Sequence, residues 1–255
     1  MKNAKSLSRI YFPEAIPAHG RCALPSAQAH HVARVLRLKA GEPLILFDGR
    51  GNEYESVIAS VTHAAVIVDV GDRHAVDRES PLAITLAQGL SSGERMDYTV
   101  QKAVELGVAR IQPLETSRSV VRLDDARARK RCAHWQSIAI SACEQCGRNR
   151  VPVVHAAIDL AGWLRSPGQG LTSPETRDTP QRLLLSLRAG TVPLREATGS
   201  ADGQRPVLFL SGPEGGLSAA EEDLALHHGF APVTLGPRVL RAETAPLAAL
   251  AALTL

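Results

Sequence analysis

Short apolar runs separated by polar turns mark the first third of the chain. The runs over 9–12, 44–47, 54–59 and 64–70 are typical of β-strands. The second and third of them flank Asp48-Gly49-Arg50-Gly51-Asn52, a glycine-bearing turn of the hairpin type. This pattern predicts a small β-rich module at the N-terminus.

One helix is expected among these strands. Ser26 is a typical N-cap, and residues 27–38 after it can form a helix that is closed by Gly41. The strands and this helix together predict a barrel-like domain over residues 1–75, which lies within the ordinary size range of domains.

After about residue 80, apolar strands alternate with amphipathic helices. Ser91 and Glu94 have the spacing of a capping box, and the helix that they open ends at Gly107. A longer helix is predicted over 125–146. Unbroken apolar strands are typical of a parallel sheet covered on both faces. The predicted strands are 83–88, 109–114, 183–187, 207–210 and 232–235. The alternation predicts an α/β domain with a mostly parallel sheet over 80–255.

The segment 211–218, Ser-Gly-Pro-Glu-Gly-Gly-Leu-Ser, directly follows a predicted strand. Its three glycines allow a sharp turn and let the backbone approach a ligand closely. Ser218 and Glu221 repeat the capping-box pattern, so the order is strand, glycine loop, helix. The loop matches neither common nucleotide fingerprint, and its carboxylate, Glu214, favours a ligand with positive, hydroxyl or amine groups. The alternative is a turn that serves packing alone.

A second candidate segment lies between the last predicted strand and the C-terminal helix. Thr244 is a good N-cap, and Pro246 fits the first helical turn. Arg241 and Glu243 lie just before that helix, in a connection where functional residues often gather. The alternative for this pair is a mutual ion pair. The helix over 245–255 is apolar on every side, so we expect it to be buried in a core or a subunit interface.

Composition narrows the possible functions. The net charge of +3 permits a nucleic-acid partner without requiring one, and 4% aromatic residues disfavour a single-strand binder built on base stacking. No apolar run reaches the roughly 18 residues of a membrane span, and charged residues interrupt any signal-peptide core. We therefore expect a soluble, cytoplasmic protein.

Segments 166–170 and 197–203, rich in small and polar residues, are predicted surface loops.

Four cysteines are too few for a disulfide scaffold. Cys143 and Cys146 form a C-x-x-C pattern, but no second pair completes a zinc site, and we expect no metal.

Several sequence blocks, in this order, resemble the RsmE family of 16S ribosomal RNA uracil-N3 methyltransferases, in the trefoil-knot (SPOUT) superfamily. The blocks are Arg9–Phe12, His31–Arg37, Phe47–Gly49, Glu94–Tyr98 with Gln101–Val108, Arg118–Val121, Glu144–Asn149, Gly212–Gly216 and Leu235–Ala245. Cys146 departs from the serine that is usual at its place. The resemblance covers nearly the whole chain.

The resemblance implies a PUA-like RNA-binding barrel over 1–75 and a knotted methyltransferase domain over 80–255. It also implies S-adenosylmethionine as cofactor, 16S RNA of the small ribosomal subunit as partner, and an active homodimer. The implied cofactor contacts are Leu187, Gly212, Glu214, Gly215, Gly216, Leu235, Gly236, Val239 and Leu240. The RNA contacts that we expect are Arg9, Arg34, Arg37, Arg118, Arg148 and Asn149.

Methylation of uracil at N3 requires that the imide proton leave, or that donors stabilise the resulting anion at the flanking carbonyls. We expect Arg241 to stabilise that anion through its fork of donors, and Glu243 to act as the base or to orient Arg241. Two alternatives stay open: a knot-type methyltransferase with another target nucleotide, and a non-catalytic ribosome-assembly protein that binds RNA.

Overall fold

The computed structural model describes residues 7–119, 125–166, 179–199 and 205–255. The chain divides into two compact units. The N-terminal unit comprises Met1–Glu79 and Ile140–Val151, and the C-terminal unit comprises Ser80–Ala139 and Pro152–Leu255. The division expected at residues 75–80 did not foresee that residues 140–151, at the end of the long helix, pack with the N-terminal unit.

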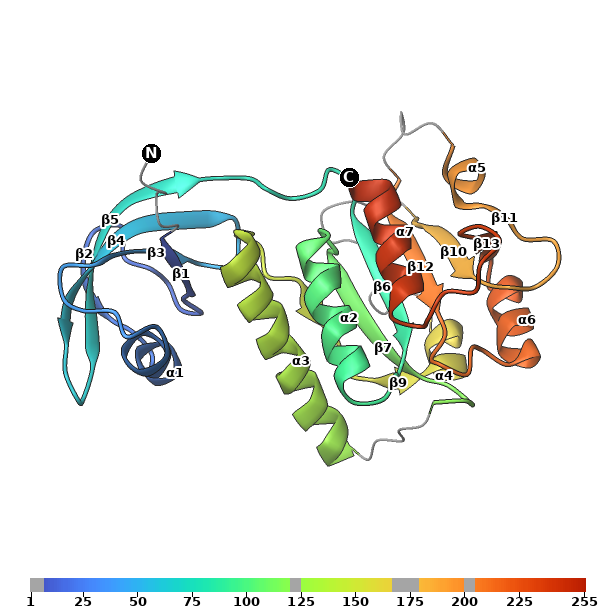
Figure 1. Ribbon diagram of the computed structural model, residues 1–255, viewed down its shortest axis with the longest axis horizontal. Helices are drawn as coiled ribbons and strands as arrows, with labels where there is room; N and C mark the ends of the chain where they lie inside the picture. Colours follow the sequence, from blue (N-terminus) through green and yellow to red (C-terminus); the bar gives the residue numbers. More distant parts are fainter. Residues whose placement is uncertain (1–6, 120–124, 167–178, 200–204) are drawn as a thin grey trace. The chain divides into compact units, whose positions relative to one another are not determined.

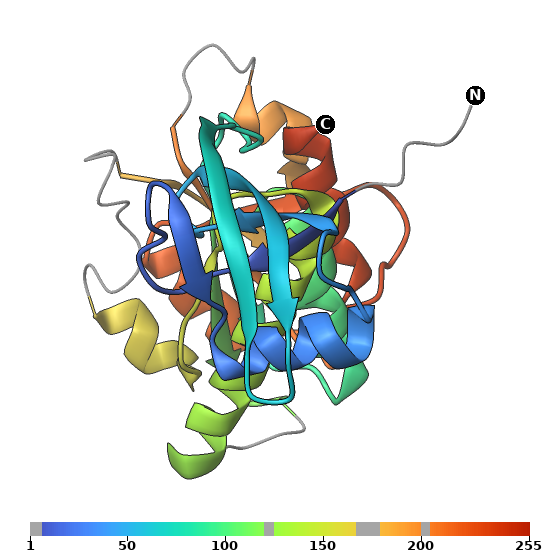
Figure 2. The ribbon, with the colours of Figure 1, turned by 90° about the vertical axis from the view of Figure 1, so that its left-hand side faces the viewer.

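The N-terminal unit is built on a five-stranded sheet with the order β1-β3-β4-β5-β2 (Figure 2). Strands β1 and β3 pair in parallel, and the other pairs are antiparallel. The alternating apolar residues of these strands pack into one core, as their sequence pattern predicts. The strands are β1 (Ser8–Tyr11), β2 (Gly20–Ala23), β3 (Pro43–Phe47), β4 (Asn52–Val61) and β5 (Val66–Ala75).

The helix of this unit differs from the prediction. A short helix, α1 (Ser26–His30), continues into a π-helical turn, η1 (His31–Leu36). Pro25 occupies the N-cap position, so the predicted cap at Ser26 is wrong. The helix is closed by Arg37, whose φ of 55° is left-handed, several residues before Gly41. Val32 in this π-helical turn is completely buried in the core of the sheet.

The C-terminal unit has an eight-stranded sheet, ordered β11-β13-β10-β12-β6-β7-β8, with β9 also paired to β7 (Figure 1). Every strand pair described in it is parallel, as predicted. The strands are β6 (Ile84–Gly89), β7 (Arg110–Glu115), β8 (Val153–Val154), β9 (Ile158–Asp159), β10 (Gln181–Leu185), β11 (Val192–Pro193), β12 (Val207–Ser211) and β13 (Ala231–Thr234).

Helices cover both faces of this sheet. On one face, α2 and α7 pack against each other, and α7 contacts β12 (Figure 1). On the other face, α4 and α6 enclose a core that includes Leu208 and Leu210 of β12. The helices are α2 (Glu94–Glu105), α3 (Asp125–Cys146), α4 (Leu160–Arg165), α5 (Leu194–Thr198), α6 (Ala219–His227) and α7 (Thr244–Thr254). Because β12 is covered from both sides, all five of its residues are buried, which explains the unbroken apolar run over 207–210.

The capping-box pattern predicts the start of α6 correctly and the start of α2 incorrectly. The capping box of Ser218 and Glu221 is present with both of its hydrogen bonds. The one predicted at Ser91 and Glu94 is wrong, because Gly93 takes the N-cap position with a φ of 46°. At α7 the N-cap is Glu243, and Thr244 is already helical.

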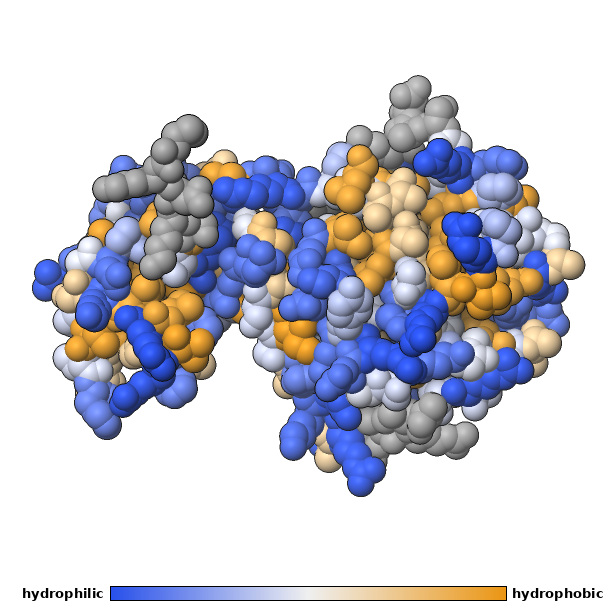
Figure 3. All heavy atoms as spheres, viewed as in Figure 1, coloured by the Kyte–Doolittle hydropathy of each residue, from blue (hydrophilic) through white to orange (hydrophobic). Residues whose placement is uncertain are grey.

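The last helix is only partly buried within this chain. Pro246, Ala249 and Leu250 are buried, whereas most other α7 side chains are half-buried. Figure 3 shows hydrophobic residues gathered on the surface over α7. The expectation of burial on every side is therefore not met by the fold of one chain.

The predicted loops at 166–170 and 197–203 lie mostly outside the described residues. Of the second one, Ala197 and Thr198 belong to α5.

Candidate functional site

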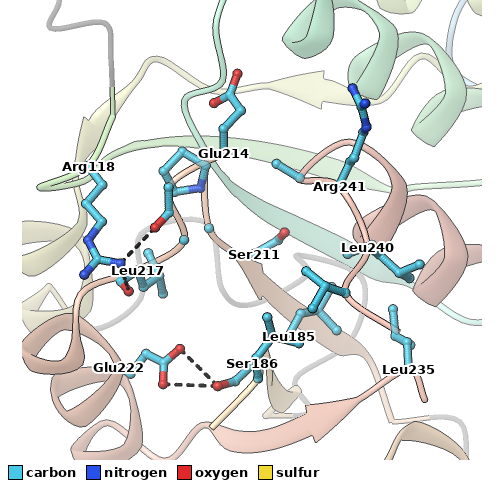
Figure 4. Close-up of a pocket in the computed structure, with 18 of the residues that line it drawn as sticks. Arg118, Leu185, Ser186, Ser211, Glu214, Leu217, Glu222, Leu235, Leu240 and Arg241 are labelled. Carbon is cyan, nitrogen blue, oxygen red and sulfur yellow. Dashed lines mark hydrogen bonds between the residues drawn. The ribbon is translucent and has the colours of Figure 1, made fainter. Parts of the chain in front are cut away.

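A cavity of about 750 Å³ lies in the C-terminal unit, where β10, β12 and β13 end (Figure 4). Segments 185–188, 211–217 and 233–235, each at a strand end, line it together with 238–243. The carboxyl ends of parallel strands meet at one edge of a sheet, which is where ligands bind in open α/β folds. The volume lies within the usual range for small-molecule sites.

The glycine loop, defined here as residues 212–217, folds back closely on itself. A Cβ atom on Gly212 would lie 2.9 Å from both the carbonyl carbon of Gly216 and the nitrogen of Leu217. A Cβ on Gly89, at the end of β6, would lie 2.6 Å from Pro213. Gly216 has a left-handed φ of 67°, which residues with a side chain rarely adopt. The glycines are therefore required by close backbone approach as well as by the turn.

Side chains at the ends of β6 and β7 hold the carbonyls of the glycine loop. The Nε2 amide of Gln88 donates to the carbonyl of Gly212 at 3.0 Å. The Nη1 group of Arg118 donates to the carbonyl of Gly215 at 2.8 Å and to that of Leu217 at 3.3 Å. Arg118 was expected to contact RNA, and its Nη1 group instead binds the backbone of the glycine loop (Figure 4).

The carboxylate of Glu214 ties the glycine loop to the start of α2. Its Oε1 atom accepts hydrogen bonds from the backbone N–H and the hydroxyl of Ser92 and from Arg95, all at 2.9 Å. Burial by itself would raise the pKa of Glu214, but these hydrogen bonds lower it to about 2.

This tie predicts an acid-sensitive contribution to stability. The folded-state pKa of Glu214 lies below the ordinary 4.5, so its contribution is fully present above about pH 4.5 and is lost as the pH falls towards 2. Glu214→Gln should lower the free energy of unfolding by about 1–3 kcal/mol at pH 7, and the difference should shrink below pH 4.5. Urea unfolding at several pH values measures it. Glu196→Gln, an exposed α5 carboxylate outside the cavity, is the control; equal losses in both variants would contradict this role.

Glu221 fastens the other end of the loop. Its carboxylate accepts from the backbone N–H and hydroxyl of Ser117 and from those of Ser218, at 2.7–2.9 Å. The capping box of α6 is thereby also a bridge to the segment after β7.

Arg241 and Glu243 both line the cavity, and Arg241 is exposed. In Figure 4 the side chains of Arg241 and Glu214 lie on the opposite side of the site from Ser186 and Glu222. Arg241 and Glu243 form no ion pair with each other in the part of the chain that the structure describes. Both side chains can therefore turn to a bound substrate without breaking such a pair.

The structure brings most of the expected cofactor contacts together. Those that line the cavity are Leu187, Gly212, Glu214, Gly215, Gly216, Leu235, Val239 and Leu240. Gly236 does not line it. Leu187 lies two residues beyond β10 and is 70% exposed, so the strand ends two residues earlier than predicted.

The other residues expected to contact RNA, besides Arg118, fall into two groups. Arg34 and Arg37 are exposed, on and just after η1. In contrast, Arg9, Arg148 and Asn149 are largely buried within the N-terminal unit.

These buried groups form a polar network. Arg9 and Asn149 form hydrogen bonds with each other and with the carboxylate of Glu53. Glu53 also forms an ion pair with Arg78. Separately, Arg148 forms an ion pair with Glu79. Burial would raise the pKa of Glu53, but the hydrogen bonds from Arg78, Arg9 and Asn149 lower it to about 2. The network fastens Asn149 to strands β1 and β4 and Arg148 to Glu79, and this structural role gives no support to direct RNA contact.

Sequence reasoning missed several residues that line the cavity, among them Ser186, Arg188, Glu222 and Arg238. Ser186 directly follows an apolar strand, a position that indicates a strand-end site. Glu222 carried no signal of its own, because it stands beside the capping residue Glu221 in an ordinary acidic helix start.

Within the described residues, no group of three or more potential ligands could hold a metal ion. Cys143 is buried, and burial raises the pKa of its thiol to about 12. The described helices include none that is both long and apolar enough to cross a membrane.

Comparisons with known proteins agree with this architecture. Residues 78–254 match the RNA methyltransferase domain family, and residues 24–71 match the RNA methyltransferase PUA domain family. The chain is 31% identical to ribosomal RNA small subunit methyltransferase E of Buchnera aphidicola (from Schizaphis graminum), over 98% of this chain and 96% of the relative. Its identity to the Bacillus subtilis protein of the same name is 32%, over 89% and 87% of the two chains.

A solved structure is also similar. The ribosomal RNA small subunit methyltransferase E of Neisseria gonorrhoeae, bound to S-adenosylmethionine, superimposes with a TM-score of 0.86 at 41% identity, over 96% of both chains. A Legionella pneumophila protein, solved in complex with the same cofactor, gives a TM-score of 0.87 at 38% identity, over 98% and 97%. With a PUA domain, a parallel α/β domain and these relatives, the chain belongs to the RNA methyltransferase family that includes ribosomal RNA small subunit methyltransferase E.

Proposed function

We propose that this protein transfers a methyl group from S-adenosylmethionine to N3 of one uracil in 16S ribosomal RNA of the small subunit. The observation that carries the proposal is the cavity at the carboxyl ends of β10, β12 and β13, lined by the glycine loop and by Arg241 and Glu243. It is supported by membership of the RNA methyltransferase family, in which a ribosomal RNA small subunit methyltransferase E has been solved bound to S-adenosylmethionine.

The lining of the cavity fits an adenosyl cofactor. Leu185, Leu235 and Leu240 offer apolar walls for a flat base, and the glycine loop brings backbone close to the cavity because its tight folding leaves no room for a Cβ atom at Gly212. When bound there, S-adenosylmethionine supplies an electrophilic methyl group on a sulfonium centre. No metal is required for such a transfer.

Arg241 is the residue to which we assign stabilisation of the reacting base. Uracil N3 carries a proton near neutral pH, and loss of that proton spreads negative charge over the two flanking carbonyl oxygens. The Arg241 guanidinium, exposed at the cavity, can donate hydrogen bonds to such an oxygen as its charge develops.

Glu243 lies two residues further along the same segment and lines the same cavity. Its carboxylate can accept the N3 proton, or it can orient Arg241 once the RNA is in place. A double variant separates these roles: if Glu243 acts only through Arg241, removing both side chains costs no more turnover than removing Arg241 alone.

Arg34 and Arg37 are the RNA contacts that we retain, because both are exposed in the PUA domain. Contacts of arginine with phosphate are salt-sensitive, since binding releases counterions.

We also propose that the C-terminal unit carries the trefoil knot of its superfamily. Because the proposed substrate is part of the ribosome, we also propose that the protein acts in the cytoplasm.

We further propose that the active form is a homodimer. The half-buried apolar side chains of α7 support this, because a second chain would complete their burial. Sedimentation equilibrium should give the mass of two chains; the mass of one chain would contradict it.

The proposed function is tested by transfer of a labelled methyl group from S-adenosylmethionine to unmodified small subunits and to naked 16S RNA. Nucleoside mass spectrometry should identify N3-methyluridine, and the two substrates together show whether assembly is required. Another methylated nucleoside would move the target to a different nucleotide. Absence of both transfer and cofactor binding would favour a non-catalytic assembly factor.

A further inference from the structure

Two polar side chains, Ser186 and Glu222, form a pair inside the cavity that the mechanism above does not use. Ser186 is the first residue after β10, and Glu222 lies in the first turn of α6. The Ser186 hydroxyl lies 3.0 and 3.1 Å from the two carboxylate oxygens of Glu222 (Figure 4). Ser186 is buried, and the Glu222 side chain is 18% exposed.

The pair presents hydrogen-bond acceptors to the cavity. The hydroxyl of Ser186 has one proton, which it gives to Glu222, and its oxygen accepts from the backbone N–H of Arg188 at 3.1 Å. An ionised carboxylate has about four acceptor positions, so Glu222 keeps capacity for further donors. A ligand that meets this pair must therefore bring N–H or O–H groups.

The nearby charges leave Glu222 open to neutral donors. The Arg188 Nη1 atom is 3.9 Å from Glu222 and 3.0 Å from Asp223, so this cation pairs closely with Asp223 and already faces Glu222. Hydroxyl groups of a ligand can donate to the remaining acceptor positions of Glu222 without displacing Arg188.

We propose that Glu222, oriented by Ser186, accepts hydrogen bonds from the ribose hydroxyls of the adenosyl cofactor; this inference rests on the proposed function. A ribose carries two neighbouring O–H donors, and a carboxylate with two oxygens can accept from both. Leu235 and Leu240 line the same cavity and suit the apolar faces of the attached base. Ser186 acts as a positioning residue, because it reaches the ligand through Glu222.

The test measures binding without turnover. Isothermal titration calorimetry compares S-adenosylhomocysteine with its 2′,3′-dideoxyribose analogue, on the wild type and on Glu222→Gln. Because hydrogen bonds to a charged group are strong, the variant should bind S-adenosylhomocysteine about tenfold more weakly. The dideoxy analogue should bind weakly to both proteins, with nearly equal affinity, since it lacks the hydroxyls that Glu222 would bind. Ser186→Ala should show the same selectivity with a smaller loss.

The matched control is Asp223→Asn. Asp223 is adjacent on α6, shares Arg188 as partner, is 65% exposed and does not line the cavity. It should leave both affinities unchanged within about twofold. Circular dichroism checks that each variant is folded.

Three results would overturn the inference. An equal loss of affinity for both ligands in Glu222→Gln would show that the carboxylate does not bind the hydroxyls. A loss that follows the exocyclic amine, seen with an inosine analogue of S-adenosylhomocysteine, would assign Glu222 to the base instead. A wild-type protein that binds no S-adenosylhomocysteine would overturn the proposed function and this inference with it.

Discussion

Arg241→Ala should lower the rate of methyl transfer by about 10²–10³-fold, the usual effect of removing a donor that stabilises charge in the transition state. The expectation follows from its place: Arg241 lines the cavity, is exposed and forms no ion pair with Glu243 within the described residues. The loss should fall on kcat, because the guanidinium meets charge that develops only during the reaction. The dissociation constant of S-adenosylmethionine should change by no more than a few fold.

Two further variants sharpen this prediction. Arg241→Lys keeps the charge but loses the planar fork of donors, so it should recover only part of the activity. Arg195→Ala, an exposed arginine on α5 outside the cavity, should behave as wild type. Single-turnover kinetics on ribosomal subunits measures the rate, and full activity of Arg241→Ala would remove this residue from the mechanism.

Gly212→Ala should abolish measurable cofactor binding and lower the stability of the C-terminal unit. The added Cβ would meet backbone atoms of Gly216 and Leu217 at 2.9 Å, closer than real Cβ contacts, and backbone cannot move aside as a flexible side chain can. Overpacking of this kind costs about 1–3 kcal/mol. The glycine loop must open to relieve it, which would break the bond between Gln88 and the carbonyl of Gly212.

Gly162→Ala is the matched control for this substitution. Gly162 lies in α4, and its added Cβ would be 3.5 Å from the carboxylate of Asp159, an ordinary contact. The control should keep wild-type affinity and lose no stability, because alanine is the better helix former. Calorimetric titration with S-adenosylhomocysteine and thermal unfolding measure the two effects. Normal binding by Gly212→Ala would show that the glycine loop tolerates side chains, contrary to its observed packing.

Strands and helix starts could be predicted from the sequence where they depend on a single local pattern. The unbroken apolar run of β12 predicted a buried parallel strand, and the spacing of Ser218 and Glu221 predicted the start of α6. Both depend on neighbours a few residues away, so the sequence carries the whole signal. The glycine loop was recognisable for the same reason, as three glycines between a strand end and a helix cap.

Other features depended on distant residues. Ser91 and Glu94 have capping-box spacing, yet Ser92 bonds to Glu214, more than one hundred residues away, and Gly93 takes the N-cap. Arg118 was expected to contact RNA, and the fold places its guanidinium against the carbonyls of Gly215 and Leu217. Local spacing cannot reveal such partners, because they meet only when strand ends converge.

The sequence by itself determined the α/β class, the order of strand, glycine loop and helix, and two of the segments that line the cavity. These follow from periodicity and from residue types at short range. Only the tertiary structure decided that residues 140–151 pack with the N-terminal unit, that Arg148 and Asn149 are buried, and that Ser186 and Glu222 meet. A contact between Ser186 and Glu222 requires β10, β12 and α6 to assemble first, and burial is a property of the assembled fold.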